Sequence, residues 1–274
     1  MSQYIDIFIH AHPDDIELFM GIAAKKAIDN GHKIVMLLAT SGDGGAKHRL
    51  LESASRKITR YHESRLIAHD EAIKYLLNTQ QNAVTHCELV GGHILTYEVF
   101  NGKVWSYNLM LPDGYKGVGF ESNKFETLEK LYKGEITSIH AIDDNHYRSL
   151  DDLKNTIQDL LLTHTKIYPN ITFHIPEYDE EKNKGAHSDH FYVSRLMNDI
   201  IKSGVFGAVS VNMYSDYING TKPKNLSADD EQFHLALNKV IDDVLIEHGR
   251  NENVRTIHSA FLGKEYVTGC FTIG

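Results

Sequence analysis

The stretch Phe8-Ile9-His10-Ala11-His12-Pro13-Asp14-Asp15 joins two segments whose hydrophobic patterns differ. Before it, residues 4–9 form a short apolar run that is typical of a buried strand. After it, apolar residues recur at helical spacing as far as Asn30-Gly31, a pair that commonly ends a helix. The polar part of the stretch therefore lies in a turn from a strand to a helix, which is where sites form in open α/β sheets.

The next segment, residues 33–39, is almost continuously apolar, which is typical of a strand buried on both faces of a parallel sheet. With the first strand and helix it predicts a right-handed βαβ unit. More helix-like and strand-like segments follow, at about 55–78, 122–133, 149–164, 171–175, 205–213 and 228–248. We therefore expect an α/β fold, with a mostly parallel sheet flanked by helices, as a single domain over residues 1–274.

Residues 84–107 alternate loosely between apolar and polar, and Asn101-Gly102 is the strongest hairpin signal in the chain. We interpret about 94–107 as an inserted β-hairpin that serves as a lid or an interface. The segment from about 216 to 274 is expected to add a helix, capped by Ser227, and then strand-like residues over 256–271.

The composition limits the classes of function. Of the 274 residues, 42% are hydrophobic and 24% charged, which is ordinary for a globular protein with a sizeable core. The 28 Lys and Arg against 37 Asp and Glu give a formal net charge of −9, so no basic surplus neutralises the phosphates of a nucleic acid or an anionic membrane. Cys87 and Cys270 fit a reduced cytosolic protein better than a disulfide framework. The N-terminus predicts neither a signal peptide nor a transmembrane segment, so we expect a cytoplasmic protein.

Two short clusters carry the chemistry. His12 and Asp15 are three residues apart, with Pro13 fixing the backbone between them, so both can reach one metal ion while Asp14 is left free to act as a base. The second cluster, His187-Ser188-Asp189-His190, again opens a helix. Each cluster alone is more simply explained as a polar helix start. Together, both at strand-to-helix turns, they favour a metal site.

The two clusters supply the parts of a catalytic centre. His12, Asp15 and one histidine of the second cluster make three ligands, and zinc with three protein ligands and an open position is the catalytic arrangement. Water in that position loses a proton near neutral pH, and Asp14 is placed to accept it. His187 and His190 share a helix face, so one can ligate while the other faces the substrate and stabilises an oxyanion. The aspartate between them can orient an imidazole.

A glycine-rich loop at residues 40–45, Thr-Ser-Gly-Asp-Gly-Gly, follows the second strand and reaches the same sheet edge as His12. It matches neither common phosphate-binding motif. Its glycines permit close backbone approach to a ligand. A plain flexible turn and a ligand-facing loop are equally open.

The two clusters, Ala11-His12-Pro13-Asp14-Asp15 and His187-Ser188-Asp189-His190, resemble the signatures of the PIG-L / LmbE-like family of zinc-dependent N-acetylglucosaminyl deacetylases. Weaker similarity extends to the 40–45 loop, to Arg60-x-x-Glu63 and to Leu111-Pro112-Asp113-Gly114. The resemblance implies a Rossmann-like fold, so that the chain would form a single LmbE-like deacetylase domain. It also implies that Zn²⁺ is held by His12, Asp15 and His190, a donor set that would accept other divalent ions as well.

The same resemblance implies the remaining roles. Asp14 would be the general base. His187 would stabilise the tetrahedral intermediate, with Asp189 behind it. Arg60 and Asp113 match positions that contact or frame the sugar.

We therefore expect a metal-dependent hydrolase that removes the N-acetyl group from an N-acetylglucosamine-type sugar conjugate. One alternative is an amidohydrolase that acts on a non-sugar amide with the same zinc centre. Another is a carbohydrate- or nucleotide-binding protein without catalysis. The presence of Asp14 argues against it, because a protein that only binds needs no general base beside a metal. The expected partner is a small sugar or sugar conjugate and not a nucleic acid, and a homo-oligomer stays open.

Overall fold

The computed structural model describes residues 2–45, 49–52 and 58–274. Within them, a central sheet of eight strands has the order β12-β11-β10-β1-β2-β7-β6-β5. Its strands are β1 (Tyr4–His10), β2 (Lys33–Thr40), β5 (Val84–Val90), β6 (His93–Phe100), β7 (Val104–Leu111), β10 (Asn170–Pro176), β11 (Val209–Ser215) and β12 (Tyr266–Ile273). The strands from β11 to β7 in this order pair in parallel, which confirms the mostly parallel sheet.

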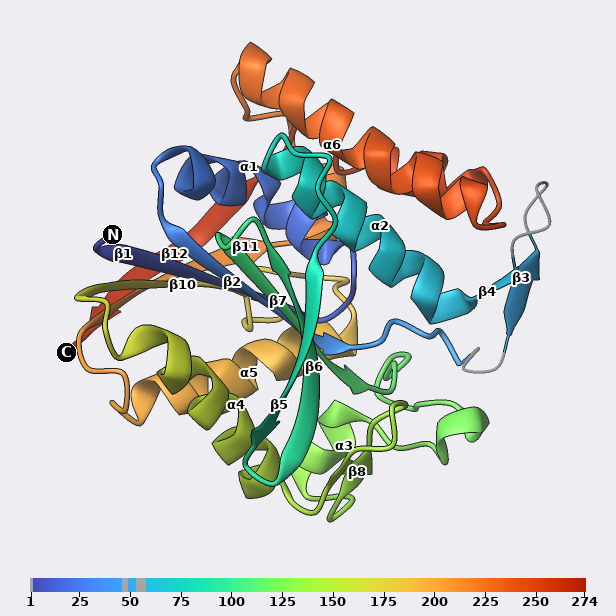
Figure 1. The fold of residues 1–274 in the computed structure, drawn as a ribbon. Coiled ribbons are helices and arrows are strands. Elements are labelled where there is room, and N and C mark those ends of the chain that lie inside the picture. Colours follow the sequence, from blue (N-terminus) through green and yellow to red (C-terminus); the bar gives the residue numbers. More distant parts are fainter. Residues whose placement is uncertain (1, 46–48, 53–57) are drawn as a thin grey trace.

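Helices cover both faces of the sheet (Figure 1). On one face lie α1 (Asp15–Asp29), α2 (Tyr61–Leu76) and α6 (Ala228–Glu247), and on the other α3 (Leu128–Lys133), α4 (Leu150–Thr165) and α5 (Ser188–Lys202). In β1, Ile7 packs into one of the two hydrophobic cores and its neighbour Phe8 into the other. Because both faces are covered, the first two strands read as continuous apolar runs.

The predicted hairpin is formed by β6 and β7, which pair antiparallel. Its turn has Asn101 at a φ of 50° and Gly102 at a φ of 64°, the positive values that this residue pair tolerates. On its other side β7 pairs in parallel with β2, so the inserted hairpin extends the central sheet and is not a separate lid.

Three segments differ from the predicted elements. Of the helix expected over about 122–133, only Leu128–Lys133 is an α-helix (α3), and Glu121–Asn123 forms a separate short 3-10 helix. Residues 58–60 form the strand β4 (Ile58–Arg60), paired with β3 (Leu50–Glu52), so the helix expected from about residue 55 begins only at Tyr61. Residues 55–57 of that prediction lie outside the described part. The strand-like segment 256–271 begins inside a helix, α7 (Asn253–Ser259), and only its later part is β12. In α7 the buried residues are Val254 and His258, four apart, which is a helical spacing.

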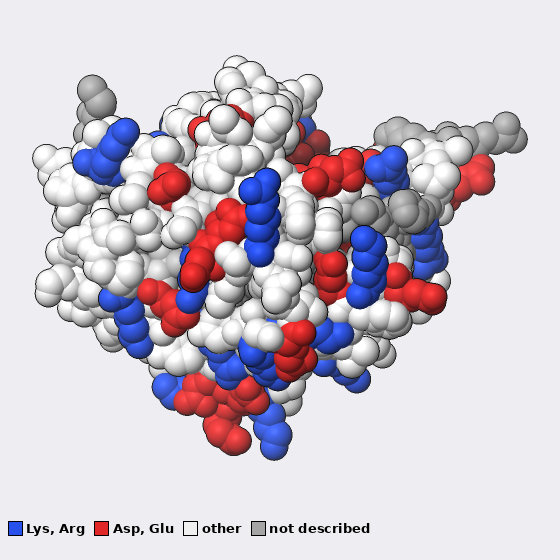
Figure 2. Space-filling view, turned by 90° about the horizontal axis from the view of Figure 1, so that it is seen from below, with Lys and Arg blue, Asp and Glu red and all other residues white. Residues whose placement is uncertain are grey.

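In the described residues, no helix is both long and apolar enough to cross a membrane. On the face in Figure 2, Lys and Arg side chains lie among Asp and Glu side chains.

Candidate metal centre

The turn between β1 and α1 carries the first cluster. Asp14 stands directly before α1 with a φ of 118°, a left-handed backbone that residues other than glycine rarely adopt. Its side chain makes no capping hydrogen bond to the helix, so the simpler interpretation as a helix cap is wrong. Strained backbone of this kind clusters at functional sites.

Three donor atoms converge behind this turn. His12 Nδ1 lies 3.0 Å from Asp15 Oδ2, and His190 Nε2 lies 3.2 Å from each of them. All three residues are buried. A zinc ion that binds nitrogen and oxygen donors tetrahedrally at about 2.0–2.2 Å holds those donors about 3.3–3.5 Å apart. The donors are therefore spaced nearly as a zinc ion requires, and the set fits the metal.

Each of the two imidazoles has a carboxylate at its other nitrogen. His190 Nδ1 lies 2.8 Å from Asp216 Oδ2, and His12 Nε2 lies 3.3 Å from Asp189 Oδ2. Asp216 directly follows β11 and is fully buried. Carboxylates in this position fix the tautomer and orientation of a metal-binding imidazole. They leave His12 Nδ1 and His190 Nε2 directed at the same point.

A third imidazole lies at the same carboxylate. His10 Nδ1 is 2.9 Å from Asp15 Oδ2, and His10, Asp15 and His190 also have the spacing of a metal-binding set. However, the Ala11 N–H donates to His10 Nδ1 at 2.9 Å, which occupies the lone pair that a metal would need. The geometry therefore favours His12 over His10 as the ligand.

The protonation of this cluster is set by Asp15. Burial opposes the charged imidazole, but the Asp15 carboxylate outweighs it and raises the pKa of His12 to about 9. The pKa of His190 is raised well above its usual range in spite of burial, by Asp15 and by Asp216. Burial would raise the pKa of Asp15, but the neighbouring histidines hold it well below its usual range. Without a metal the site thus holds an anionic carboxylate between protonated imidazoles, and a metal ion that binds there would displace the imidazole protons.

An arginine orients Asp14 and leaves one of its two carboxylate oxygens open. Arg65 Nη2 donates to Asp14 Oδ1 at 2.7 Å, and its other nitrogens donate to the carbonyls of Pro13 and Gly42 at 3.2 and 3.0 Å. A Cβ on Gly42 would lie 2.3 Å from Arg65 Nη1, so this loop needs glycine to let the guanidinium approach. Among the described residues, Asp14 Oδ2 accepts no hydrogen bond, and His258 Nε2 lies 4.0 Å away.

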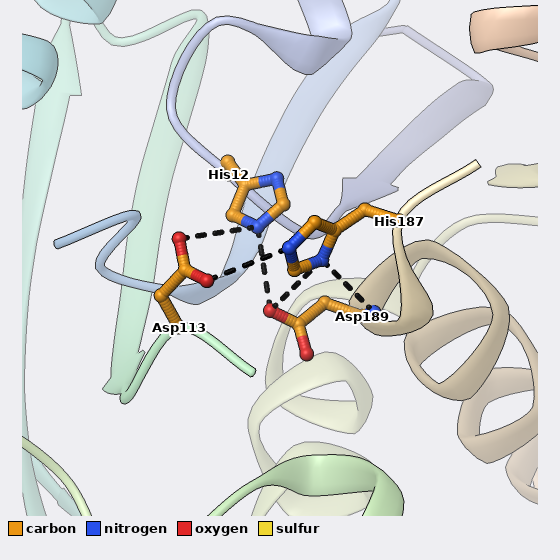
Figure 3. Close-up of side chains that lie close together, drawn as sticks. All are labelled: His12, Asp113, His187 and Asp189. Atoms are coloured by element: carbon orange, nitrogen blue, oxygen red, sulfur yellow. Dashed lines mark hydrogen bonds and ion pairs between the residues drawn. The ribbon is translucent and has the colours of Figure 1, made fainter. Parts of the chain in front are cut away.

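The side chains of His187 and Asp113 lie on the other flank of His12 (Figure 3). His187 Nε2 is 3.5 Å from Asp113 Oδ1, and burial lowers the pKa of His187. Asp189 Oδ2 is 3.5 Å from His187 Nδ1 but 3.3 Å from His12 Nε2, so it serves His12 at least as closely as the histidine beside which it was expected. Asp189 is further fixed by the Gly114 N–H, which donates to Oδ2 at 2.8 Å.

Arg60 is not brought into the cluster. Its side chain is 58% exposed, and it pairs with Glu63, whose Oε1 lies 3.8 Å from Arg60 Nε. The structure instead brings in two residues that the sequence analysis missed, Arg65 and Asp216. The role of Asp216 could have been inferred from the sequence, because it directly follows an apolar strand whose end reaches the same sheet edge as His12. The role of Arg65 could not be inferred from the sequence, because its contacts depend on where α2 begins.

Asp216 supports a quantitative prediction. Asp216→Asn weakens the acceptor at His190 Nδ1, so we expect the apparent dissociation constant for zinc to rise about 10- to 100-fold. Competition with a chromophoric chelator measures it. The matched control is Asp6→Asn, which alters a buried pair with His174, 2.9 Å apart and outside the centre, and should leave zinc affinity unchanged. Equal affinities in wild type and Asp216→Asn would contradict the role of Asp216.

Part of the chain matches a known protein family, and the fold is similar to that of solved structures. Residues 7–93 match the PIG-L family, described as GlcNAc-PI de-N-acetylase. No curated protein matches the chain significantly. N,N′-diacetylchitobiose deacetylase from Pyrococcus horikoshii, solved with its inhibitor MPG, has a TM-score of 0.50 at 14% identity over 99% of this chain and 84% of its own.

Two further solved structures are similar. The zinc-inhibited form of a teicoplanin deacetylase has a TM-score of 0.47 at 12% identity, over 98% of this chain and 97% of its own. A 4-carboxy-2-hydroxymuconate hydratase from Pseudomonas putida has a TM-score of 0.44 at 11% identity, over 93% and 83%. Residues 7–93, which contain the first histidine–aspartate signature, thus match the PIG-L family as the sequence resemblance predicted, and the chain has the fold of the chitobiose deacetylase.

Proposed function

We propose that this protein is a metal-dependent deacetylase that removes the N-acetyl group from an N-acetylglucosamine-type sugar conjugate. The observation that carries the proposal is the convergence of His12 Nδ1, Asp15 Oδ2 and His190 Nε2 within 3.2 Å, where the first two come from a turn that the PIG-L family model matches. The fold shared with a chitobiose deacetylase supports it.

His12, Asp15 and His190 would hold the ion. A bound zinc ion supplies Lewis acidity, which lowers the pKa of water and polarises an amide carbonyl. Two histidines and one carboxylate would also accept other divalent ions, because the donor types alone do not select zinc.

The protein's own groups manage the protons. Asp14 would take a proton from the attacking water through Oδ2, the oxygen that Arg65 leaves open. The Arg65 ion pair fixes the direction of that carboxylate, which is the positioning that a general base needs. His187 would stabilise the developing oxyanion and protonate the departing amine, and Asp113 at 3.5 Å would stabilise its charged form.

Sugar binding by Asp113 and Arg60 is a separate part of the proposal. A contact between Asp113 and the sugar is supported by its position 3.5 Å from His187 Nε2. If His187 faces the reacting amide, the part of the sugar next to that amide would lie beside Asp113. Arg60 lies at the exposed start of α2, so a contact with the sugar would have to come from a larger substrate that reaches this rim.

The proposal is tested by acetate release. Zinc-loaded protein, chelator-treated protein and chelator-treated protein with zinc restored are each incubated with N-acetylglucosamine, N,N′-diacetylchitobiose, N-acetylglucosamine 1-phosphate and two acetamides without a sugar. We expect acetate from at least one sugar, its loss after chelation and its return with zinc. Acetate from the non-sugar amides alone would support the amidohydrolase alternative. Failure to bind zinc would contradict both.

A further inference from the structure

A cavity of about 250 Å³ opens beside the metal centre, and Asp14 and Asp15 belong to its wall. This is slightly below the roughly 300–1,000 Å³ of pockets for drug-sized ligands and suits one sugar ring with its substituents. Among the described residues a larger hollow, about 490 Å³, lies at the opposite sheet edge, and no Asp, Glu, His, Lys or Arg lines it. The cavity at Asp14 instead has a proposed metal ligand, Asp15, in its wall.

The C-terminal part of the chain builds most of this cavity. Tyr217 follows β11, Leu245 comes from α6, and Val254 and His258 come from α7. Tyr217 is in edge contact with the ring of His190, with centroids 5.1 Å apart. The cavity is thus shaped by residues outside the segment that matches the PIG-L family and yet adjoins a proposed metal ligand.

Two arginines line the cavity and differ in their hydrogen bonds. Arg65 donates to Pro13, Gly42 and Asp14, so its guanidinium is engaged within the protein. Arg250 Nη1 is buried and has no partner among the described residues. Its guanidinium lies 4.1 Å from the centroid of the Tyr61 ring, which fixes its plane. Burying a cationic donor without an acceptor costs free energy. A bound ligand that accepts a hydrogen bond from Nη1 would remove this cost.

The charge of the missing acceptor follows from its surroundings. Burial lowers the pKa of Arg250, because the charged guanidinium is poorly solvated there. A carboxylate or a phosphate would compensate best, since either accepts paired hydrogen bonds from a guanidinium and cancels its charge. Arg65 and Asp14 also act on the charge of Arg250. Leu245, Val254 and Phe261 are the apolar part of the cavity wall and would pack against the uncharged part of a ligand.

We propose that Arg250 is a specificity-determining residue that binds an anionic group, a carboxylate or a phosphate, on the sugar substrate. The proposal rests on the proposed deacetylase function, because it places the reacting acetamide at Asp14 and the anion in the same cavity. The substrate class becomes an acidic N-acetylglucosamine conjugate. Arg250 does not take part in the chemical step.

The test compares neutral and anionic ligands on three zinc-loaded proteins. The ligands are N-acetylglucosamine, its 1-phosphate and N-acetylmuramic acid, so that phosphate and carboxylate form separate arms. Arg250→Met removes the charge and the donors but keeps an apolar chain of similar length. The matched control is Arg255→Met, since Arg255 is exposed, pairs with Asp243 at 2.7 Å and does not line the cavity.

We expect wild type to bind at least one anionic ligand about 10- to 100-fold more tightly than the neutral sugar, measured by calorimetry. Arg250→Met should lose that preference, raise KM for the acidic substrate with little change in kcat, and keep its zinc. Arg255→Met should behave as wild type. No preference in wild type, or an equal loss for neutral and acidic ligands in Arg250→Met, would overturn the proposal. Because binding is measured directly, charge-selective binding without acetate release would contradict only the deacetylase function.

Discussion

Asp14→Asn is expected to lower kcat for acetate release by about 10²- to 10⁴-fold, the contribution of a positioned general base. Asparagine has the same shape and tolerates the positive φ of 118° at this position. Its amide oxygen can still accept from Arg65 Nη2, now 2.7 Å from Asp14 Oδ1. What it cannot do is accept the proton from water.

The measurement is kcat and KM together with zinc content by elemental analysis. Zinc content should equal that of wild type, because Asp14 is not one of the three converging donors. Asp29→Asn, which changes an exposed partner of Lys25 at the end of α1, serves as the control and should keep full activity. If Asp14→Asn keeps wild-type activity, Asp14 is not the general base. If it loses its zinc, Asp14 is part of the metal site.

His190→Ala is expected to lose the metal, whereas His187→Ala is expected to keep it. The two histidines are three residues apart at the start of α5, and the sequence by itself left open which of them ligates. In the structure His190 Nε2 lies 3.2 Å from Asp15 Oδ2, while His187 Nε2 faces Asp113 at 3.5 Å. Removing the first imidazole breaks the three-ligand set, and removing the second leaves it intact.

Elemental analysis after gel filtration separates the two variants. Wild type and His187→Ala should retain about one zinc per chain, and His190→Ala close to none. Both variants should release acetate far more slowly than wild type, for different reasons: His190→Ala lacks the ion, and His187→Ala lacks the group that stabilises the oxyanion. Circular dichroism against metal-free wild type checks the fold. Zinc retained by His190→Ala and lost by His187→Ala would reverse the assignment.

Most of the elements could be predicted from the sequence because their signals are local. Apolar runs predicted β1 and β2, and a serine at the start of a helical pattern predicted the cap of α6, where Ser227 accepts from the backbone as expected. The hairpin turn at Asn101 and Gly102 was likewise determined by residues next to one another. Such features depend on backbone sterics and short-range hydrogen bonds, which hold wherever the segment lies in the fold.

The hydrophobic pattern of the sequence did not determine which of two arginines, Arg60 or Arg65, reaches Asp14. Arg60 and Arg65 both stood in one predicted helix, yet Arg60 precedes α2 in an exposed strand and Arg65 lies one turn inside it. The hydrophobic pattern did not fix where the helix begins, and five residues along a helix turn a side chain by more than a third of a revolution. Which arginine reaches Asp14 was therefore undetermined.

The sequence by itself determined that an imidazole and two carboxylates stand in the turn after β1, and that two histidines open a later helix. Only the tertiary structure decided that His12 and His190 meet at Asp15, that Asp216 supports His190 and that Arg250 lines the adjoining cavity. The physical reason is that these contacts join residues far apart in the chain, and the parallel pairing of β1, β10 and β11 brings their carboxyl ends to one edge. Sequence patterns record neighbours along the chain, whereas the site is made of neighbours across the sheet.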